Sequence, residues 1–446
     1  MSSPHLHLPI WVFAIFANLY LPLIFALPSH QPFLPVLDPS GTPVSASLYA
    51  PFSYNELNKR ALQKRDEPEN PKFYRYARQR SNSYYYYDIS SSLTAYKKNE
   101  YIAYVEISKP IVAGGQGEVS YARVNYYNGQ SEFKGVVKET EGAEALSKAE
   151  LQRIVLQDEK EASDDSTIRV PWIQELLWVP EVPEEYSAQT VVVMKKLDGE
   201  LSSLLRNNDN YDETFAVLEL LRGIRDIHAS GVIHRDLNPN NVMFERDSAG
   251  KLAWYVIDFD YAINFNDLDQ SPNWMYPIGT PTYAPPDWPN RQQRDLLPAI
   301  DVWLLARTHY DILNPGFRSA KSDDGGSLSK EIMDYINGLV LKFRVPAGGN
   351  LREELDDHKD EVYQNLMSGF DSSKTIDERL EEEVKIIAEM FVPQSYRPGV
   401  AQYYKRYCGM LTEYTNLEVI CPDSKDARWI NRLNYKDVSM YNVACI

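Results

Sequence analysis

Residues 234–241 read His-Arg-Asp-Leu-Asn-Pro-Asn-Asn and follow an apolar segment with helical periodicity. Asp236 and Asn241 stand five residues apart in the loop that this stretch predicts. Phosphoryl transfer requires a carboxylate near the attacking hydroxyl and an amide oxygen on a metal ion, and these two side chains supply both. Asn, Asp and Pro are also ordinary turn residues, so a polar turn without chemistry is the alternative. Motifs elsewhere in the chain have to decide between the two.

The segments on either side of this loop predict a buried helix and a hairpin. Apolar side chains recur every three or four positions in residues 212–231, which is typical of a helix with one apolar face. Residues 254–262 read Trp-Tyr-Val-Ile-Asp-Phe-Asp-Tyr-Ala and predict a strand that ends near Asp258. An unpaired carboxylate at the end of a buried strand is strongly disfavoured. A magnesium ion held by Asp258 and Asn241 explains it better than a chance salt bridge.

A glycine turn and a lysine precede these motifs. Residues 101–124 alternate apolar and polar side chains, as half-buried strands do, and the turn within them lets backbone amides approach phosphate oxygens. The next strand ends in Lys138, and an inward-facing lysine is costly unless it is paired. The phosphates of ATP and a helix carboxylate provide such partners. The predicted phosphate loop comprises Val112, Gly114, Gly115 and Gly117, and Val119 follows at the spacing of a strand that covers adenine.

The helix carboxylate is expected in residues 142–160, whose composition and period are helical. Glu150 is the predicted partner of Lys138, because Ile154 one turn later belongs to an apolar face. Glu144 and Glu159 are the alternatives.

Composition excludes several classes of protein. The chain has 446 residues, of which 43% are hydrophobic, which suffices for a sizeable core and about two to three domains. Its net charge of −17 argues against a nucleic-acid partner, which needs clustered Lys and Arg. Its three cysteines, Cys408, Cys421 and Cys445, form neither a disulfide scaffold nor a zinc site. One bridge with one free thiol, or three buried thiols, are the two alternatives.

The N-terminal region predicts passage through the secretory pathway. Residues 9–28 carry no charge, which suits a cleaved signal within 1–29 or a single-pass membrane anchor. Residues 30–95 are rich in Pro, Ser and Asn, so we expect a disordered linker or pro-segment. Within it, Lys59-Arg60 and Lys64-Arg65 are dibasic pairs of the kind that processing proteases cut. The expected location is therefore outside the cell or in the secretory lumen, with membrane association only if the apolar segment stays uncleaved.

Two later motifs complete an ordered set. Residues 279–287 read Gly-Thr-Pro-Thr-Tyr-Ala-Pro-Pro-Asp, and a buried helix with Asp301 near its start follows. Arg397 is a candidate partner for Asp287. Together with the glycine turn, Lys138, the helix carboxylate and the loop at 234–241, these motifs resemble the eukaryotic protein kinase superfamily. The resemblance covers about residues 96–410.

The resemblance implies an α+β fold with two lobes. A small N-terminal lobe, 96–197, would hold an antiparallel sheet with one helix, and a larger, mainly helical lobe would span 198–410. Residues 411–446 would form a C-terminal extension packed on that second lobe.

The resemblance also implies roles for individual residues. Lys138 would hold the α- and β-phosphates of ATP, Asp236 would orient the acceptor hydroxyl, and Asn241 with Asp258 would bind Mg²⁺. The strand ending at residue 194 is similar to the one that enters a kinase hinge. Its predicted adenine contacts are Met194 and Leu197.

The implied function is transfer of the ATP γ-phosphate to a Ser or Thr hydroxyl of a protein. Departures from the family pattern predict slow chemistry: Val112 replaces a glycine, Asn238 a lysine and Asp260 a glycine. Two alternatives therefore remain, a secreted pseudokinase that acts as an interaction module and a small-molecule kinase of the aminoglycoside or choline type. The Asp-Phe-Asp form at 258–260 is similar to fungal-type kinase groups.

Overall fold

The computed structural model divides the chain into two units, Met1–Lys59 and Arg60–Ile446, and every described residue lies in the second. The expected signal segment, the dibasic pairs, Cys421 and Cys445 lie outside the described residues. The described ranges are 74–86, 101–114, 117–142, 144–161, 170–180, 187–265, 277–289, 291–314, 328–370 and 375–414.

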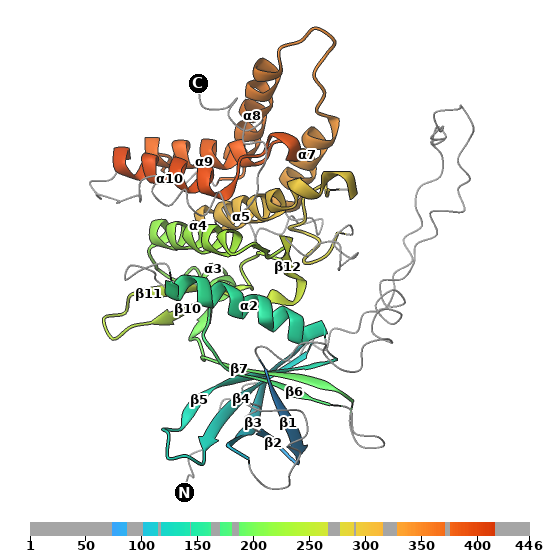
Figure 1. The fold of residues 1–446 in the computed structure, drawn as a ribbon. Coiled ribbons are helices and arrows are strands. Elements are labelled where there is room, and N and C mark those ends of the chain that lie inside the picture. Colours follow the sequence, from blue (N-terminus) through green and yellow to red (C-terminus); the bar gives the residue numbers. More distant parts are fainter. Residues whose placement is uncertain are drawn as a thin grey trace, which may run out of the picture. The chain divides into compact units, whose positions relative to one another are not determined.

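The N-terminal part of the described chain is a closed β-barrel (Figure 1). Its strands follow each other in the order β1-β2-β3-β4-β5-β7-β6. Neighbouring strands are antiparallel except β1 and β6, which pair in parallel and close the barrel. Within the predicted lobe, 96–197, every strand pair is antiparallel as expected, and the parallel pair arises from β1, which precedes that range. The strands are β1 (Arg75–Arg80), β2 (Ser83–Tyr86), β3 (Ala103–Gly114), β4 (Gly117–Tyr126), β5 (Phe133–Glu141), β6 (Ile173–Val179) and β7 (Gln189–Met194).

The prediction of a disordered linker over residues 30–95 is wrong for residues 74–86, which form the hairpin β1–β2. Tyr84 and Tyr86 point into the barrel and are fully buried, while the residues between and beside them are partly exposed. This alternation is what a strand covering a core produces. Arg75 at the start of β1 also forms an ion pair with the buried Glu175 of β6, 3.1 Å apart. Tyrosine side chains supply the apolar surface in a segment whose overall composition is polar.

Helix α2 (Glu144–Glu161) lies between the barrel and the helical part of the chain (Figure 1). It contacts β6 and β7 of the barrel, and it also contacts α4 (Glu213–Ala229). Its buried residues include Leu146 and Val155, which belong to the large hydrophobic cluster shared with the helices. The helix therefore joins the two parts of the core.

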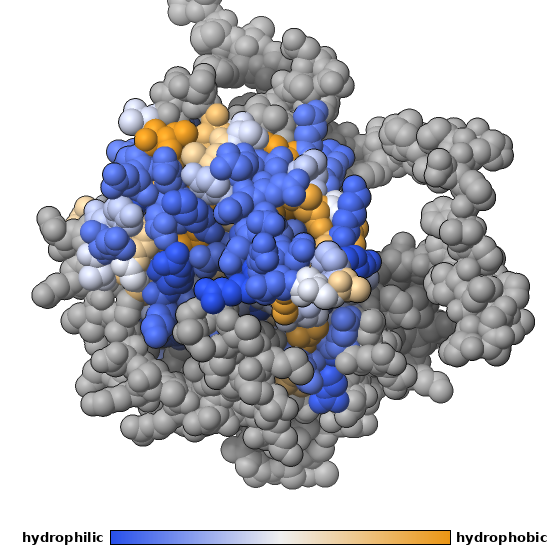
Figure 2. Space-filling model, turned by 90° about the horizontal axis from the view of Figure 1, so that it is seen from above, coloured by the Kyte–Doolittle hydropathy of each residue, from blue (hydrophilic) through white to orange (hydrophobic). Residues whose placement is uncertain are grey.

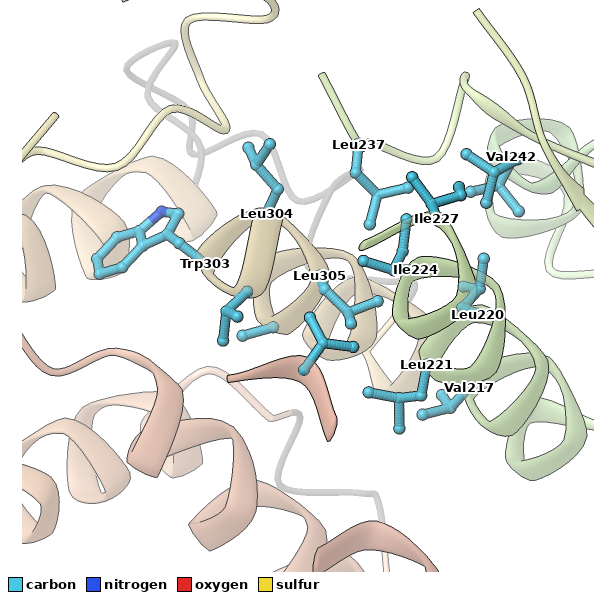
Figure 3. Packing of buried hydrophobic residues seen from close by; sticks show 14 of the residues in the cluster. Val217, Leu220, Leu221, Ile224, Ile227, Leu237, Val242, Trp303, Leu304 and Leu305 are labelled. Carbon is cyan, nitrogen blue, oxygen red and sulfur yellow. The ribbon is translucent and has the colours of Figure 1, made fainter. Parts of the chain in front are cut away.

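The C-terminal part of the described chain is mainly helical and is built around α4 and α5. The side chain of Asp212 caps α4 by accepting a hydrogen bond from the backbone N–H of Phe215, 2.8 Å away. Figure 3 shows apolar side chains of α4 packing against those of α5. The helices are α3 (Leu201–Asn207), α4, α5 (Pro298–Leu313), α7 (Leu328–Lys342), α8 (Leu351–Ser368), α9 (Glu378–Met390) and α10 (Val400–Tyr414).

The boundary predicted at residues 410 and 411 falls inside α10, which continues to Tyr414. Leu411 is fully buried, so the helix is anchored beyond that point. Residues 415–446 lie outside the described residues. The cysteine in α10, Cys408, is buried and disulfide-bonded.

The surface seen from above is mainly hydrophilic, and its hydrophobic side chains form small separate patches (Figure 2). Within the described residues, no helix combines the length and the apolar character needed to cross a bilayer.

Short strands carry the loops of the candidate site, four of them between α4 and α5 and one before α3. They are β8 (Gly199–Glu200), β9 (Val232–Ile233), β10 (Val242–Arg246), β11 (Leu252–Val256) and β12 (Ile263–Asn264). β9 pairs with β12 and β10 pairs with β11, so the loop at 234–241 and the residues after β11 are held against each other. A short 3-10 helix, η2 (Phe259–Tyr261), follows β11.

Candidate active site

Asp301 of α5 anchors the loop at 234–241. The carboxylate of Asp301 is fully buried and accepts hydrogen bonds from the backbone N–H groups of His234 and Arg235, at 2.8 and 2.7 Å. His228 Nε2 lies 2.8 Å from the same carboxylate. Burial acts to raise the pKa of Asp301, but the hydrogen bond and charge of His228 outweigh it and lower that pKa. A charged carboxylate therefore fixes the start of the loop.

Two residues of the site have backbone conformations that ordinary residues seldom adopt. Arg235 and Asp258 both have φ of +66°. Such strain persists only where the surrounding structure enforces it, and it is concentrated at functional sites. The hydrogen bonds of Asp301 enforce it at Arg235.

Four donors contact the carboxylate of Asp236, one of them from Asn238 and the other three from Asn241 and Thr280. Asn241 Nδ2 lies 2.9 Å from its Oδ2 atom, while the N–H and the Oγ1 atom of Thr280 lie 2.7 and 2.8 Å from its Oδ1 atom. Burial raises the pKa of the Asp236 carboxyl, and the hydrogen bonds from Thr280 oppose this rise. The site thus contains a fixed, buried carboxylate suited to accept a hydrogen bond from a hydroxyl group.

Asn238 takes the place where the family pattern has a lysine. Its Nδ2 atom lies 3.0 Å from the backbone oxygen of Asp236, 3.3 Å from Oδ1 of Asp236 and 3.1 Å from Oγ1 of Thr280. The amide therefore connects the loop to the segment at Thr280, but it brings no positive charge. This geometry explains how the loop stays ordered without the lysine.

A backbone hydrogen bond brings Asn241 close to Asp258, the other predicted metal ligand. The backbone oxygen of Asn241 accepts a hydrogen bond of 3.0 Å from the N–H of Ile257, the residue before Asp258. The Nδ2 atom of Asn241 is bound to Asp236, so the amide oxygen is its remaining polar atom. Carboxylate and amide oxygens are ligands that Mg²⁺ accepts, and Mg²⁺ commonly takes few protein ligands together with substrate phosphates. The donor set therefore fits Mg²⁺ shared with a phosphate.

Lys138 forms ion pairs with two carboxylates, at 2.9 Å to Asp258 and 2.5 Å to Asp260. Burial acts to lower the pKa of Lys138, but these two charges outweigh it and raise that pKa. For Asp258, burial acts in the upward direction and the ammonium group of Lys138 lowers the pKa overall. Burial and the neighbouring Asp258 raise the pKa of Asp260 to about 6.

The predicted pairing of Lys138 with Glu150 is wrong. The ion pairs of Lys138 within the described residues are those with Asp258 and Asp260, and the charged neighbour that affects Glu150 is Arg153. Helical periodicity identified α2 but could not show which of its faces meets β5. Glu150 lies on another face.

A cavity adjoins Lys138 between β5, α2 and η2. Met194 at the end of β7 lines it together with Lys138 and Asp258, as expected for the back of an adenine site. Leu197 is buried just beyond β7 and is absent from this lining. Val119 pairs with Lys138 across β4 and β5.

The predicted phosphate loop connects β3 and β4. The register brings Val112 opposite Val119 and Gly114 opposite Gly117, and Gly115 lies outside the described residues. Gly117 needs to be glycine, because a β-carbon there would lie 2.5 Å from the backbone oxygen of Glu139.

The sequence did not indicate the role of Gly279. It did indicate the ion pair between Asp287 and Arg397. Gly279 packs directly against Asp236, a contact that no local pattern shows. Arg397 Nη2 lies 3.0 Å from Oδ1 of Asp287, and the arginine is almost completely buried. Three further hydrogen bonds join this guanidinium to backbone oxygens, so the pair fixes the end of the segment that carries Thr280.

The fold and this arrangement of Lys, Asp and Asn side chains fit the set of groups that phosphoryl transfer uses. The family model described as protein kinase domain matches residues 115–392, which is more than half of the chain. The chain belongs to the protein kinase family.

Curated relatives carry similar segments. Mitogen-activated protein kinase 17 of Oryza sativa subsp. japonica is 30% identical over 126 residues, which are 27% of this chain and 21% of the relative. Mitogen-activated protein kinase 15 of Arabidopsis thaliana is 31% identical over 118 residues, 26% of this chain and 20% of the relative. The matches therefore span about a fifth of the length of these relatives.

Proposed function

We propose that the protein is an ATP-dependent protein kinase that transfers the γ-phosphate to Ser or Thr hydroxyl groups. The observation that carries this proposal is the connected set Lys138, Asp236, Asn241 and Asp258. Lys138 pairs with Asp258, Asn241 bonds to Asp236, and the backbone of Asn241 bonds to Ile257. Candidate groups for binding phosphate, binding a metal ion and orienting the hydroxyl thereby lie in one connected set.

Each residue has a distinct part in the proposed reaction. Lys138 binds the α- and β-phosphates of ATP, and Asn241 with Asp258 would hold Mg²⁺. When bound, this ion neutralises phosphate charge. Asp236 accepts a hydrogen bond from the acceptor hydroxyl and orients its oxygen towards the γ-phosphorus. Asn238 and Thr280 keep the carboxylate of Asp236 in place during this step.

A protein acceptor is favoured over a small molecule for two reasons. The relatives with similar segments are named mitogen-activated protein kinases. Asp236 also accepts a hydrogen bond from Thr280. Thr280 belongs to the segment whose end is fixed by the ion pair between Asp287 and Arg397. That segment lies next to the carboxylate that would meet the acceptor and offers a backbone platform for a peptide.

A pseudokinase that binds nucleotide without transfer is the second candidate. Asn238 favours it, because a neutral amide cannot neutralise charge on the transferring phosphate. Labelled ATP with Mg²⁺ and a mixed Ser, Thr and Tyr peptide library separates the candidates. Phosphate on Ser or Thr, absent with the Asp236→Asn variant, supports the proposal. Nucleotide binding without transfer would replace it with the pseudokinase, and labelling of choline or an aminoglycoside alone would replace it with a small-molecule kinase.

The proposal includes a secretory-pathway location. Residues 9–28 suit a signal or an anchor, and the disulfide of Cys408 is of a kind that persists in oxidising compartments. The N-terminal residue of the mature protein tests this part. A start after residue 26 or after Arg65 supports it, whereas a start at Met1 contradicts cleavage.

A further inference from the structure

Among the side chains of α2 that the structure describes, none that lines the cavity beside Lys138 is a carboxylate. The residues of α2 that line the cavity beside Lys138 are Ala145, Lys148, Ala149 and Gln152. The amine of Lys148 is itself bonded to the backbone oxygen of Ala262, 2.7 Å away. A cation on this face of the helix cannot pair with a second ammonium group, so the anion that Lys138 needs has to come from elsewhere.

Asp260 supplies that anion from η2. Its Oδ2 atom lies 2.5 Å from the amine of Lys138, and its side chain is 15% exposed. Asp258 is the more accessible partner, with 35% of its side chain exposed and a distance of 2.9 Å. The shorter and better buried contact of Lys138 is therefore the one to Asp260.

The two carboxylates differ in what else they have to do. In the proposed reaction Asp258 faces Mg²⁺, and a carboxylate that binds a metal holds a lysine less strongly. The proposed reaction assigns Asp260 no part in that metal site, so its contact with Lys138 can persist when nucleotide is present. The cavity also contains two cations, Lys138 and Lys148, and two carboxylates, so removing Asp260 would leave an excess of positive charge.

We propose that Asp260 is the positioning residue for Lys138, in place of a carboxylate from α2. This inference rests on the proposed function, because it assigns Lys138 to the phosphates of ATP. Asp260 acts through Lys138 and does not itself contact substrate. The family pattern has glycine at position 260. An aspartate can occupy this position here because residue 260 lies in η2 and has a helical conformation, which does not require glycine.

A double-mutant cycle in the full-length protein tests the proposal. Wild type, Lys138→Met, Asp260→Asn and the double variant are compared by peptide phosphorylation at saturating ATP and by affinity for a fluorescent ATP analogue. We expect Asp260→Asn to slow transfer about tenfold or more, and Lys138→Met to have much less effect in that background than in wild type. A second cycle, with Glu150→Gln in place of Asp260→Asn, is the control. We expect Glu150→Gln to change the transfer rate and the nucleotide affinity by the same factor in wild type and in the Lys138→Met background. Thermal melting confirms that each variant is folded.

Three outcomes would overturn the proposal. The first is that the effects of Asp260→Asn and Lys138→Met multiply in both measurements, and the second is that coupling appears with Glu150→Gln. The third is that Asp260→Asn raises the Mg²⁺ concentration needed for transfer, which would identify Asp260 as a metal ligand. The affinity measurement keeps the two proposals separate. Coupling in nucleotide affinity without any transfer by wild type supports the role of Asp260 and contradicts only the proposed function.

Discussion

A β-carbon added to Gly279 would lie 2.8 Å from the Oδ1 atom of Asp236 and 2.8 Å from the backbone oxygen of Arg235. Gly279 also has φ of +85°, a conformation that residues with side chains rarely adopt. The segment before Thr280 can approach the carboxylate of Asp236 only because Gly279 has no side chain.

Replacement of Gly279 by alanine is expected to displace Asp236. We predict a loss of phosphate transfer of about 10² or more, because a small misplacement of a reacting group has effects of that size. Kinetics of peptide phosphorylation measure it. Gly250→Ala is the matched control, because Gly250 has the same φ of +85° but open space around it. Equal effects of the two substitutions on transfer would show that crowding at Asp236 is unimportant.

Replacement of Asn238 by lysine is expected to speed transfer about tenfold, because a positive charge next to the transferring phosphate stabilises the transition state. Asn238→Ala should slow it, because the bond to Thr280 is lost. The rate constants at saturating ATP and acceptor measure both changes. A lysine variant no faster than wild type would mean that the missing charge does not limit the reaction.

Replacement of Asp301 by asparagine is expected to destabilise the protein by about 2–4 kcal/mol, because an amide nitrogen would face buried donors. The backbone amides of His234 and Arg235 would then lose an acceptor. Urea denaturation measures the change in the free energy of unfolding. Asp295→Asn is the control, since the side chain of Asp295 is 82% exposed. Similar small changes for both variants would refute the anchoring role of Asp301.

Lys148 predicts a specific dependence of stability on pH. Burial, with a smaller contribution from Arg235, lowers its pKa from 10.5 to about 8. Between these values the unfolded chain binds the proton that the folded chain has released, so the contribution of Lys148 to stability increases as pH rises.

The Lys148→Met variant should therefore be more stable than wild type at pH 7, by on the order of 1–3 kcal/mol. The difference should shrink as pH rises from about 8 to 10.5. Urea denaturation over this range measures it, with the exposed Lys134→Met as control. A difference that stays constant with pH would contradict the assigned pKa.

Short motifs with fixed spacing identified most of the site. Asp236 and Asn241 share one loop, so their proximity follows from the sequence, and Asp258 follows from the hairpin between them. Lys138 was identified because a buried lysine has to be paired. Its partner was not, because Asp260 meets it across 122 residues and helix periodicity does not fix the rotation of α2.

The elements of the fold were predictable wherever the residues of a single segment determine its secondary structure. The alternating strands and the helix α4 followed from hydrophobic periodicity, and their arrangement in two lobes followed from the resemblance to protein kinases. The hairpin β1–β2 was interpreted as a linker because its segment is polar overall. Its place in the barrel depends on Arg75 meeting Glu175, one hundred residues later. Gly279 likewise acquires its role only from the position of Asp236. Contacts of this kind are set by tertiary packing and leave no local pattern.

The central claim is that Asp236 and its neighbours transfer phosphate. Its most direct test measures phosphate transfer from ATP to a Ser or Thr peptide by wild type and Asp236→Asn, after both have been shown to bind ATP with similar affinity. The account predicts transfer by wild type and a loss of at least about 10²-fold in the variant. Equal rates in the two proteins, or ATP binding without transfer in wild type, would contradict it.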